Sequence, residues 1–271
     1  MKKIMLFAAA ALVGATFADG VASDVVGYNT ITIHPGWNMF AVNYDGVSGT
    51  AGVPINDLLP KTGITAGSGS GSADTISVWK EDGSGDYDMY FLYYTTKAKF
   101  TSANYTWVES AGTTSSAALQ PGRCFWYYSR NANDVTVSFA GKVPFSATSR
   151  QINIVNGWNM IGNPFTSGFA LNDSSWGTYW KDRVDAGDAV AGSGSGSADT
   201  ISVWKEDGSG DYDMYFLYYT TKAKFTSANY TWVESAGTTF NGNLADLGLG
   251  MYYYCRGNGF KLQMPRPYSA E

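Results

Sequence analysis

The residues best suited to chemistry form a short acidic loop that occurs twice in the chain. Residues 82–88 read Asp-Gly-Ser-Gly-Asp-Tyr-Asp, and residues 207–213 repeat them without change. Oxygen-bearing side chains at alternate positions suit a loop that wraps a hard cation such as calcium. The candidate calcium ligands are Asp82, Ser84, Asp86, Asp88, Asp207, Ser209, Asp211 and Asp213. The alternative is a plain hairpin turn with its carboxylates in water, because Tyr87 and Tyr93 stand where an EF-hand loop has glycine and glutamate.

Aromatic residues next to these acids form a second candidate site. Tryptophan and tyrosine beside Asp and Asn suit sugar rings, which stack on aromatic faces and hydrogen-bond to carboxylates and amides. The alternative is that these rings lie in the core or in cross-strand pairs. The predicted ligand-binding face comprises Trp79, Tyr87, Tyr90, Trp107, Trp204, Tyr212, Tyr215 and Trp232.

The inventory of catalytic residues is poor. His34 is the only histidine, which excludes histidine-assisted nucleophiles and zinc sites with several histidines. A glycosidase needs only two carboxylates, so a hydrolase that uses Glu109 and Glu234 remains an alternative. We therefore name no catalytic residue and expect binding in place of catalysis.

Short strands must position these side chains. Residues 29–33 alternate polar and apolar side chains, as a half-buried strand does. Residues 75–80 and 89–95 read as the two arms of a hairpin around the acidic loop. Further strands are predicted at residues 37–43, 105–109, 123–129 and 135–139. Separated by Gly, Pro, Asn and Asp clusters, these strands predict an all-β sandwich or a small barrel.

A tandem repeat divides the chain. Residues 66–114, which we call the first cassette, recur unchanged at residues 191–239, the second cassette, and the flanking segments recur more loosely. Each cassette carries six acidic residues and three lysines, so the acidity of the chain belongs to the cassettes. A period of this length suits a small domain better than a solenoid repeat. We predict two tandem β-units, residues 19–146 and residues 147–271.

The N-terminus predicts export. A positive Met-Lys-Lys start, a short apolar run and small residues before Ala18 are typical of a cleaved signal peptide over residues 1–18. The apolar run is too short to span a bilayer, so no transmembrane helix is expected in the mature chain. The formal charge of −5 makes nucleic acid an unsuitable partner. Cys124 and Cys255, the two cysteines, either pair in the exported protein or remain half-buried thiols.

The flanking motifs resemble a family of exported, mostly uncharacterised proteins of Planctomycetes, Verrucomicrobia and Lentisphaerae bacteria. The resemblance lies in Gly-Trp-Asn-Met at residues 157–160 followed by Asn-Pro at 163–164, in Val-Trp-Lys at 78–80, in Leu-Gln-Pro-Gly at 119–122 with Phe-Trp at 125–126, and in the closing segment 135–144. The resemblance implies export and repetition but no known activity.

Together these observations favour an exported, non-catalytic module of the cell surface, the extracellular space or the periplasm. Its expected role is adhesion, glycan contact or envelope structure, with glycan or envelope components as partners and calcium as the one candidate cofactor. A glycan-active hydrolase with paired carboxylates is the first alternative. An outer-membrane β-barrel is the second, because Tyr-rich strands and an acidic composition also suit that class.

Overall fold

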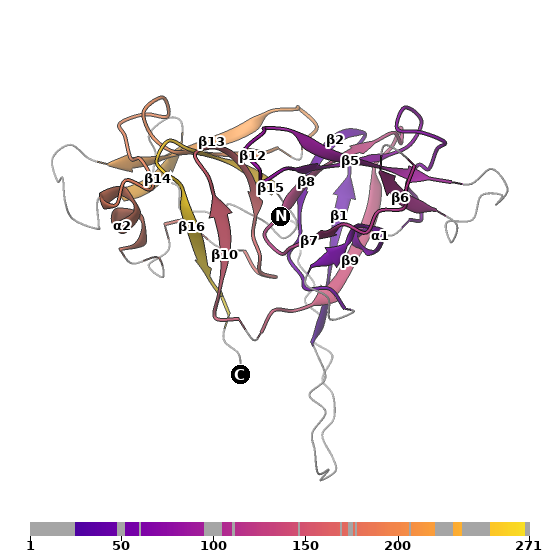
Figure 1. Cartoon of the computed structure of the whole chain (residues 1–271), viewed down its shortest axis with the longest axis horizontal. Helices are drawn as coiled ribbons and strands as arrows, with labels where there is room; N and C mark the ends of the chain where they lie inside the picture. Colours follow the sequence, from indigo (N-terminus) through magenta and orange to yellow (C-terminus); the bar gives the residue numbers. More distant parts are fainter. Residues whose placement is uncertain are drawn as a thin grey trace, which may run out of the picture.

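The computed structural model shows an all-β protein, as the sequence predicts (Figure 1). It describes residues 25–47, 52–59, 61–94, 105–109, 112–145, 147–168, 170–172, 176, 178–205, 207–219, 230–234 and 250–268. The predicted signal peptide, residues 1–18, lies outside the described residues. Within the described ranges, none of the helices has the length and apolar character needed to cross a membrane.

The first half of the molecule is built on one open, antiparallel, five-stranded sheet in the order β2-β8-β4-β5-β6. Its strands are β2 (Gly36–Ala41), β8 (Cys124–Ser129), β4 (Thr75–Trp79), β5 (Tyr87–Tyr93) and β6 (Thr106–Glu109). A ribbon of β1 (Val26–Ile33) and β9 (Val135–Lys142) forms a second layer. The short pair β3 (Val53–Pro54) and β7 (Ala118–Leu119) and the helix α1 (Ile55–Leu58) complete this half.

The second half repeats this plan with the order β11-β15-β12-β13-β14. Its strands are β11 (Gly157–Gly162), β15 (Gly250–Cys255), β12 (Thr200–Trp204), β13 (Tyr212–Tyr219) and β14 (Tyr230–Glu234), and its ribbon is β10 (Ser149–Ile154) with β16 (Phe260–Pro265). A longer helix, α2 (Tyr179–Asp185), packs Trp180 into the core. The composition gave no sign of this helix.

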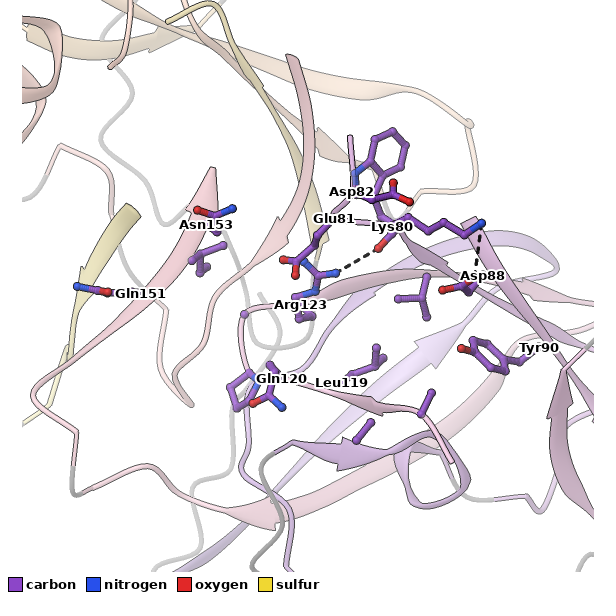
Figure 2. Close-up of a pocket in the computed structure, with 17 residues that line it drawn as sticks. Lys80, Glu81, Asp82, Asp88, Tyr90, Leu119, Gln120, Arg123, Gln151 and Asn153 are labelled. Carbon is purple, nitrogen blue, oxygen red and sulfur yellow. Dashed lines mark hydrogen bonds and ion pairs between the residues drawn. The ribbon is translucent and has the colours of Figure 1, made fainter. Parts of the chain in front are cut away.

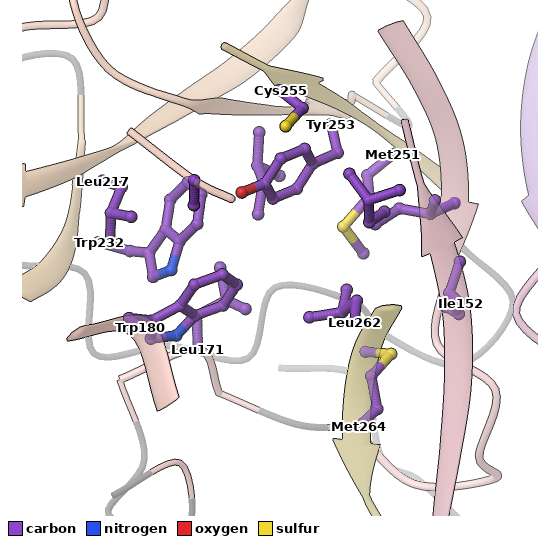
Figure 3. Close-up of a cluster of buried hydrophobic side chains, with 14 of the residues drawn as sticks. Ile152, Leu171, Trp180, Leu217, Trp232, Met251, Tyr253, Cys255, Leu262 and Met264 are labelled. Atoms are coloured by element: carbon purple, nitrogen blue, oxygen red, sulfur yellow. The ribbon is translucent and has the colours of Figure 1, made fainter. Parts of the chain in front are cut away.

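Each core lies between a five-stranded sheet and its ribbon, so each half is a small two-layered sandwich. Alternation along the strands selects the core face: in β8, Phe125 and Tyr127 are buried, whereas Trp126 and Tyr128 face the other way. Figure 3 shows the equivalent core of the second half, where Tyr253 of β15 lies among aliphatic and indole side chains.

The glycine-serine loop at residues 67–72 folds back on the sheet. Gly67 forms a parallel bridge with Tyr93, and its amide donates to the carbonyl of Leu92 at 2.9 Å. A Cβ on Gly67 would meet the Ser72 carbonyl carbon at 2.8 Å, so this close return needs glycine. The copied loop is held in the same way, by a hydrogen bond from the Gly192 amide to the Leu217 carbonyl at 3.0 Å.

The two sheets meet through the faces that turn away from their own cores (Figure 1). Met39, Ala41 and Cys124 of the first half pack there against Met160 of the second. Backbone contacts join the halves too, since the Gly162 amide donates to the Gly122 carbonyl at 2.9 Å. We call this contact between the sheets the junction.

Candidate functional site

The acidic hairpins use their oxygen atoms within the protein. The Lys80 ammonium lies 2.9 Å from Asp86 Oδ2 and 3.7 Å from Asp88 Oδ1. Asp82 Oδ1 accepts the amide of Ser84 at 2.9 Å, which is the side-chain-to-backbone bond of an Asx turn. The hydrogen bonds from Ser84 hold the pKa of Asp82 below its usual range, and the bond from Lys80 does the same for Asp86.

The second hairpin has the same arrangement. Lys205 lies 3.2 Å from Asp211 and 3.5 Å from Asp213, and Asp207 accepts the amide of Ser209 at 2.9 Å. In the ranges that the structure describes, no group of three or more His, Cys, Asp or Glu side chains is placed to hold a metal ion. Calcium therefore stays a prediction from the loop sequence.

Four of the eight predicted ligand-binding aromatics are buried, and the prediction of an exposed face is wrong for them. Trp107 and Trp232 have no exposed surface, and Tyr90 and Tyr215 are only 6% and 9% exposed. Each belongs to the core of its half, because it lies on the sheet face that meets the ribbon. The hairpins carry aromatic residues on both faces, so the local sequence does not reveal which face is covered.

The other four predicted aromatics, Trp79, Tyr87, Trp204 and Tyr212, are half-buried at the junction. Trp79 packs edge to face on Tyr87, with ring centroids 5.1 Å apart, and Trp204 packs on Tyr212 at the same distance. Burial raises the pKa of Tyr212 to about 12. The cassettes thus supply the rings by which the two halves contact each other.

Two flanking residues complete the junction. Trp126 Nε1 donates to the hydroxyl oxygen of Tyr252 at 2.8 Å, and that hydroxyl lies 2.7 Å from the hydroxyl of Tyr87. The contacts are reciprocal, as in an approximate two-fold pair: Trp126 packs on Trp204 at 5.0 Å, and Tyr252, the counterpart of Trp126, packs on Trp79 at 6.4 Å.

The exposed tryptophans lie outside the cassettes. Trp37 and Trp158 are 50% and 49% exposed, and in the described part of the chain they are the only tryptophans classed as exposed. Each follows a glycine with positive φ, 84° at Gly36 and 90° at Gly157, in the turn that enters β2 or β11. The Gly-Trp-Asn motif therefore sets a left-handed turn and presents the indole on the outer sheet face.

The asparagine of each motif closes that turn. Asn38 Oδ1 accepts the amide of His34 at 2.8 Å, and its Nδ2 donates to the carbonyl oxygens of His34 and Gly36. Asn159 makes the same set of bonds with Val155 and Gly157. Each turn is thus fixed by three hydrogen bonds from one buried amide.

Each exposed indole packs on a tyrosine, and an arginine packs on that tyrosine in turn. We call each set of three side chains, Trp37 with Tyr128 and Arg130 or Trp158 with Tyr254 and Arg256, a platform. Trp37 packs on Tyr128 at 4.9 Å, and the Arg130 guanidinium lies 5.2 Å from the Tyr128 ring. Arg130 is fixed in turn, because its Nε donates to Ala73 O at 2.8 Å and an Nη donates to Ser70 O at 2.9 Å. Such cation–π contacts on a held side chain stiffen the platform.

The second platform repeats the first. Trp158 packs on Tyr254 at 4.7 Å, and the Arg256 guanidinium lies 5.0 Å from that ring. Arg256 also donates to the cassette loop, to Ala198 O at 2.8 Å. Sequence reasoning missed both platforms, although the recurrence of Gly-Trp-Asn-Met in otherwise drifted flanks was a signal that could have found them.

One row of rings connects the two platforms across the junction. Successive centroid distances are 5.7 Å from Trp37 to Trp126, 6.3 Å from Trp126 to Tyr252 and 5.7 Å from Tyr252 to Trp158. The exposed indoles are the ends of this row, and the two middle rings are half-buried. The row therefore links the two exposed indoles through rings that belong to the junction.

A cleft of about 770 Å³ opens beside the junction, between the two halves (Figure 2). Its walls are the end of β4 with the following acidic turn, the segment 117–123 that leads into β8, and residues 151–153 of β10. Arg123 lies at its centre in an ion pair with Glu81, and burial lowers the pKa of this guanidinium.

Two buried aspartates, which the sequence reasoning did not single out, tie the cassettes to the flanks. Asp74 accepts the Tyr127 hydroxyl at 2.6 Å and the Arg130 amide at 2.6 Å. Asp199 accepts the equivalent groups of Tyr253 and Arg256 at 2.8 and 2.7 Å. These carboxylates position the ends of β8 and β15, directly before Arg130 and Arg256.

The remaining candidate residues are the two cysteines and the two glutamates. Cys124 and Cys255 are both buried and free, the first at the junction and the second in the core of the second half. Glu109 lies on β6 and Glu234 on β14, at opposite ends of the molecule (Figure 1). These glutamates occupy equivalent positions of the two cassettes, so the structure places one in each half.

Comparisons with protein families, with curated protein sequences and with solved structures found no match to this chain.

Proposed function

We propose that this protein is an exported, non-catalytic module that holds a glycan chain on a row of aromatic rings. The observation that carries the proposal is the pair of half-exposed indoles, Trp37 and Trp158, at the two ends of one row. Export rests on the signal-peptide pattern of residues 1–18.

The platforms suit sugar rings because they are apolar, flat and held in place. Leaving half of an indole in water forgoes part of the 1.5–3 kcal/mol or so that burying a large apolar side chain typically contributes. A pyranose covers such a ring with its C–H face while its hydroxyl groups remain in water. Rings fixed by tyrosine and arginine contacts bind with a smaller loss of conformational entropy.

Two platforms on one molecule favour a polymer over a single sugar. A chain that contacts Trp37 and then Trp158 makes the second contact intramolecularly, so the two weak contacts reinforce each other. Adhesion to a surface polysaccharide needs this property more than it needs a deep pocket.

The experiment compares the mature protein with Trp37→Ala, Trp158→Ala and the double variant, on a glycan array and in pull-down by insoluble polysaccharides. Met89→Ala with Met214→Ala is the matched control, because these methionines are also exposed, at 46% and 41%, but lie outside the row. We expect each single variant to weaken binding several-fold and the double variant to abolish it, with unchanged melting temperatures. Full binding by the double variant, or no binding by the wild type to any glycan, would overturn the proposal.

Export is tested separately. Expression of the full chain in a Gram-negative host should give a product outside the cytoplasm whose first residue is Asp19, determined by mass spectrometry. Recovery of the chain in the cytoplasm with residues 1–18 intact would contradict the assignment.

A further inference from the structure

We propose that the cleft between the halves is a second binding site, which takes one short, uncharged, hydroxyl-rich ligand. The cleft is separate from the aromatic row: none of the four rings of the row lines it. Its volume of about 770 Å³ lies within the usual range of small-molecule sites, roughly 300–1,000 Å³.

The charges that line the cleft are already paired within the protein. Arg123 is paired with Glu81 and also donates to the Trp79 carbonyl at 3.1 Å. Lys80 is shared between Asp86 and Asp88, and Asp82 accepts the backbone amide of Ser84. A charged ligand would have to displace one of these partners and leave a partly buried ion unpaired, which is costly.

Uncharged polar groups supply the contacts that a polyol needs. Gln120 comes from the first half, whereas Gln151 and Asn153 come from β10 of the second. A side-chain amide both donates and accepts hydrogen bonds, and a hydroxyl group does the same, so the two match without any charge. Ala117, Ala118 and Pro121, which are not buried, add apolar surface for the C–H face of a sugar.

Gly122 allows the two walls of the cleft, segment 117–123 and β10, to lie close together. Its φ is +87°, and a Cβ at this position would meet Ile152 Cδ1 at 2.9 Å. The second half can approach the segment 117–123 so closely only because residue 122 has no side chain. A ligand in the cleft therefore contacts both halves at once and stabilises the junction.

The arginine of the cleft has no counterpart in the aligned sequence of the second repeat. When β15 is aligned with β8, so that Cys124 matches Gly250, Arg123 matches Leu249. The sequence therefore has no arginine at that position to pair with Glu206, which is the copy of Glu81. The two identical cassettes thus lie beside flanking segments of different sequence. We therefore expect each chain to bind one ligand in the cleft, although it has two tryptophan platforms.

The test uses the mature full chain carrying Trp37→Ala and Trp158→Ala, so that binding to the aromatic row does not contribute to the signal. Isothermal titration with maltotriose, cellotriose, xylotriose and triacetylchitotriose is compared with titration by trigalacturonate. We expect at least one neutral trisaccharide to bind with a stoichiometry of one and to raise the melting temperature. Tighter binding of trigalacturonate than of every neutral trimer, or no binding of any neutral trimer, would overturn the proposal.

Variants then locate the site. Asn153→Ala removes an exposed side chain from the β10 wall, so the fold should be kept, and we expect affinity to fall about tenfold, as for the loss of a good hydrogen bond. Arg123→Leu, which introduces the residue of the aligned position, leaves Glu81 unpaired in the wall of the cleft and should also weaken binding. Lys205→Met, at the copy of the cleft residue Lys80 in the second cassette, is the control and should bind as its parent does. Unchanged affinity in Asn153→Ala and Arg123→Leu would place the ligand elsewhere and refute the cleft, whatever the fate of the tryptophan platforms.

Discussion

The sulfur of Cys124 occupies the space in which Gly250 would carry a side chain. These residues hold equivalent positions, since each begins the second strand of its five-stranded sheet, and they face each other across the junction. A Cβ on Gly250 would overlap the Cys124 sulfur and would meet Met39 Cγ at 2.7 Å. The two halves therefore fit as an unlike pair, with a larger residue on one side and the smallest on the other.

Gly250→Ala should destabilise the protein, because the added methyl group overpacks the junction. We expect a loss of about 1–3 kcal/mol in the free energy of unfolding, the usual cost of inserting a methyl group into a packed region. Cys124→Ala combined with Gly250→Ala should recover much of this loss, since removing the sulfur makes room for the methyl group. Urea unfolding of the two single variants and the double variant gives the coupling energy.

Gly69→Ala is the control for this cycle. Nothing lies within 4 Å of a Cβ at Gly69, so a methyl group there should change stability little. Strictly additive losses at Cys124 and Gly250 would show that the two residues do not compete for one space.

Tyr252→Phe should weaken the junction by removing one hydroxyl group. Trp126 Nε1 would lose its acceptor, and Tyr87 would lose its hydroxyl partner. Leaving a half-buried donor unpaired costs about 1–2 kcal/mol. Thermal unfolding measures the effect, with Tyr254→Phe as the matched control on the same face of β15. Equal melting temperatures for wild type and Tyr252→Phe would show that these bonds do not stabilise the contact.

Much of this architecture follows from patterns in the sequence. The strands predicted at residues 29–33, 75–80 and 135–139 fall on β1, β4 and β9, because alternation and turn residues are local signals. The helix α2 was missed, since seven residues with one buried tryptophan carry too weak a period. The start of β5 at Tyr87, two residues before the predicted start, was missed because the hairpin register sets it.

The site was harder to predict for a physical reason. A strand with aromatic residues on both faces, such as β5, does not reveal which face meets the ribbon and which meets the other sheet. Both Tyr90 and Tyr87 were predicted to face a ligand, but Tyr90 lies in the core and Tyr87 lies at the junction. The cleft depends on residues from both halves, Arg123 and Asn153, that are brought together only by the junction.

The buried Asp199 should give the protein a distinctive pH dependence. Burial raises the pKa of its carboxyl group, against hydrogen bonds from Arg256 and Tyr253 that lower it. The contribution of this group to stability is then fully present below the unfolded pKa of about 3.9 and is lost as the pH rises through the folded pKa. The free-energy cost of Asp199→Asn should therefore be largest at acid pH and shrink toward neutral pH, in urea unfolding at a series of pH values.

The pKa of Asp207 is shifted in the opposite direction to that of Asp199. Hydrogen bonds from Ser209 lower the pKa of this exposed carboxylate, so its contribution is present above the unfolded pKa and is lost as the pH falls. The cost of Asp207→Asn should thus grow with pH, although it should be small. A cost of Asp199→Asn that grows with pH in the same way would contradict the raised pKa.

The ion pairs of Lys80 and Lys205 favour the plain-turn alternative for the acidic hairpins, so calcium should leave the melting temperature of the wild type unchanged relative to a chelator. A specific site must stabilise the folded state in proportion to its occupancy. In each hairpin, however, one ammonium already lies between the two carboxylates that a cation would use, Lys80 with Asp86 and Asp88 in the first. A divalent ion would have to displace that ammonium from a turn whose third aspartate accepts a backbone amide. A saturable rise in melting temperature with calcium, lost in the variant Asp86→Asn with Asp211→Asn, would favour the calcium site and assign the ion to the hairpins.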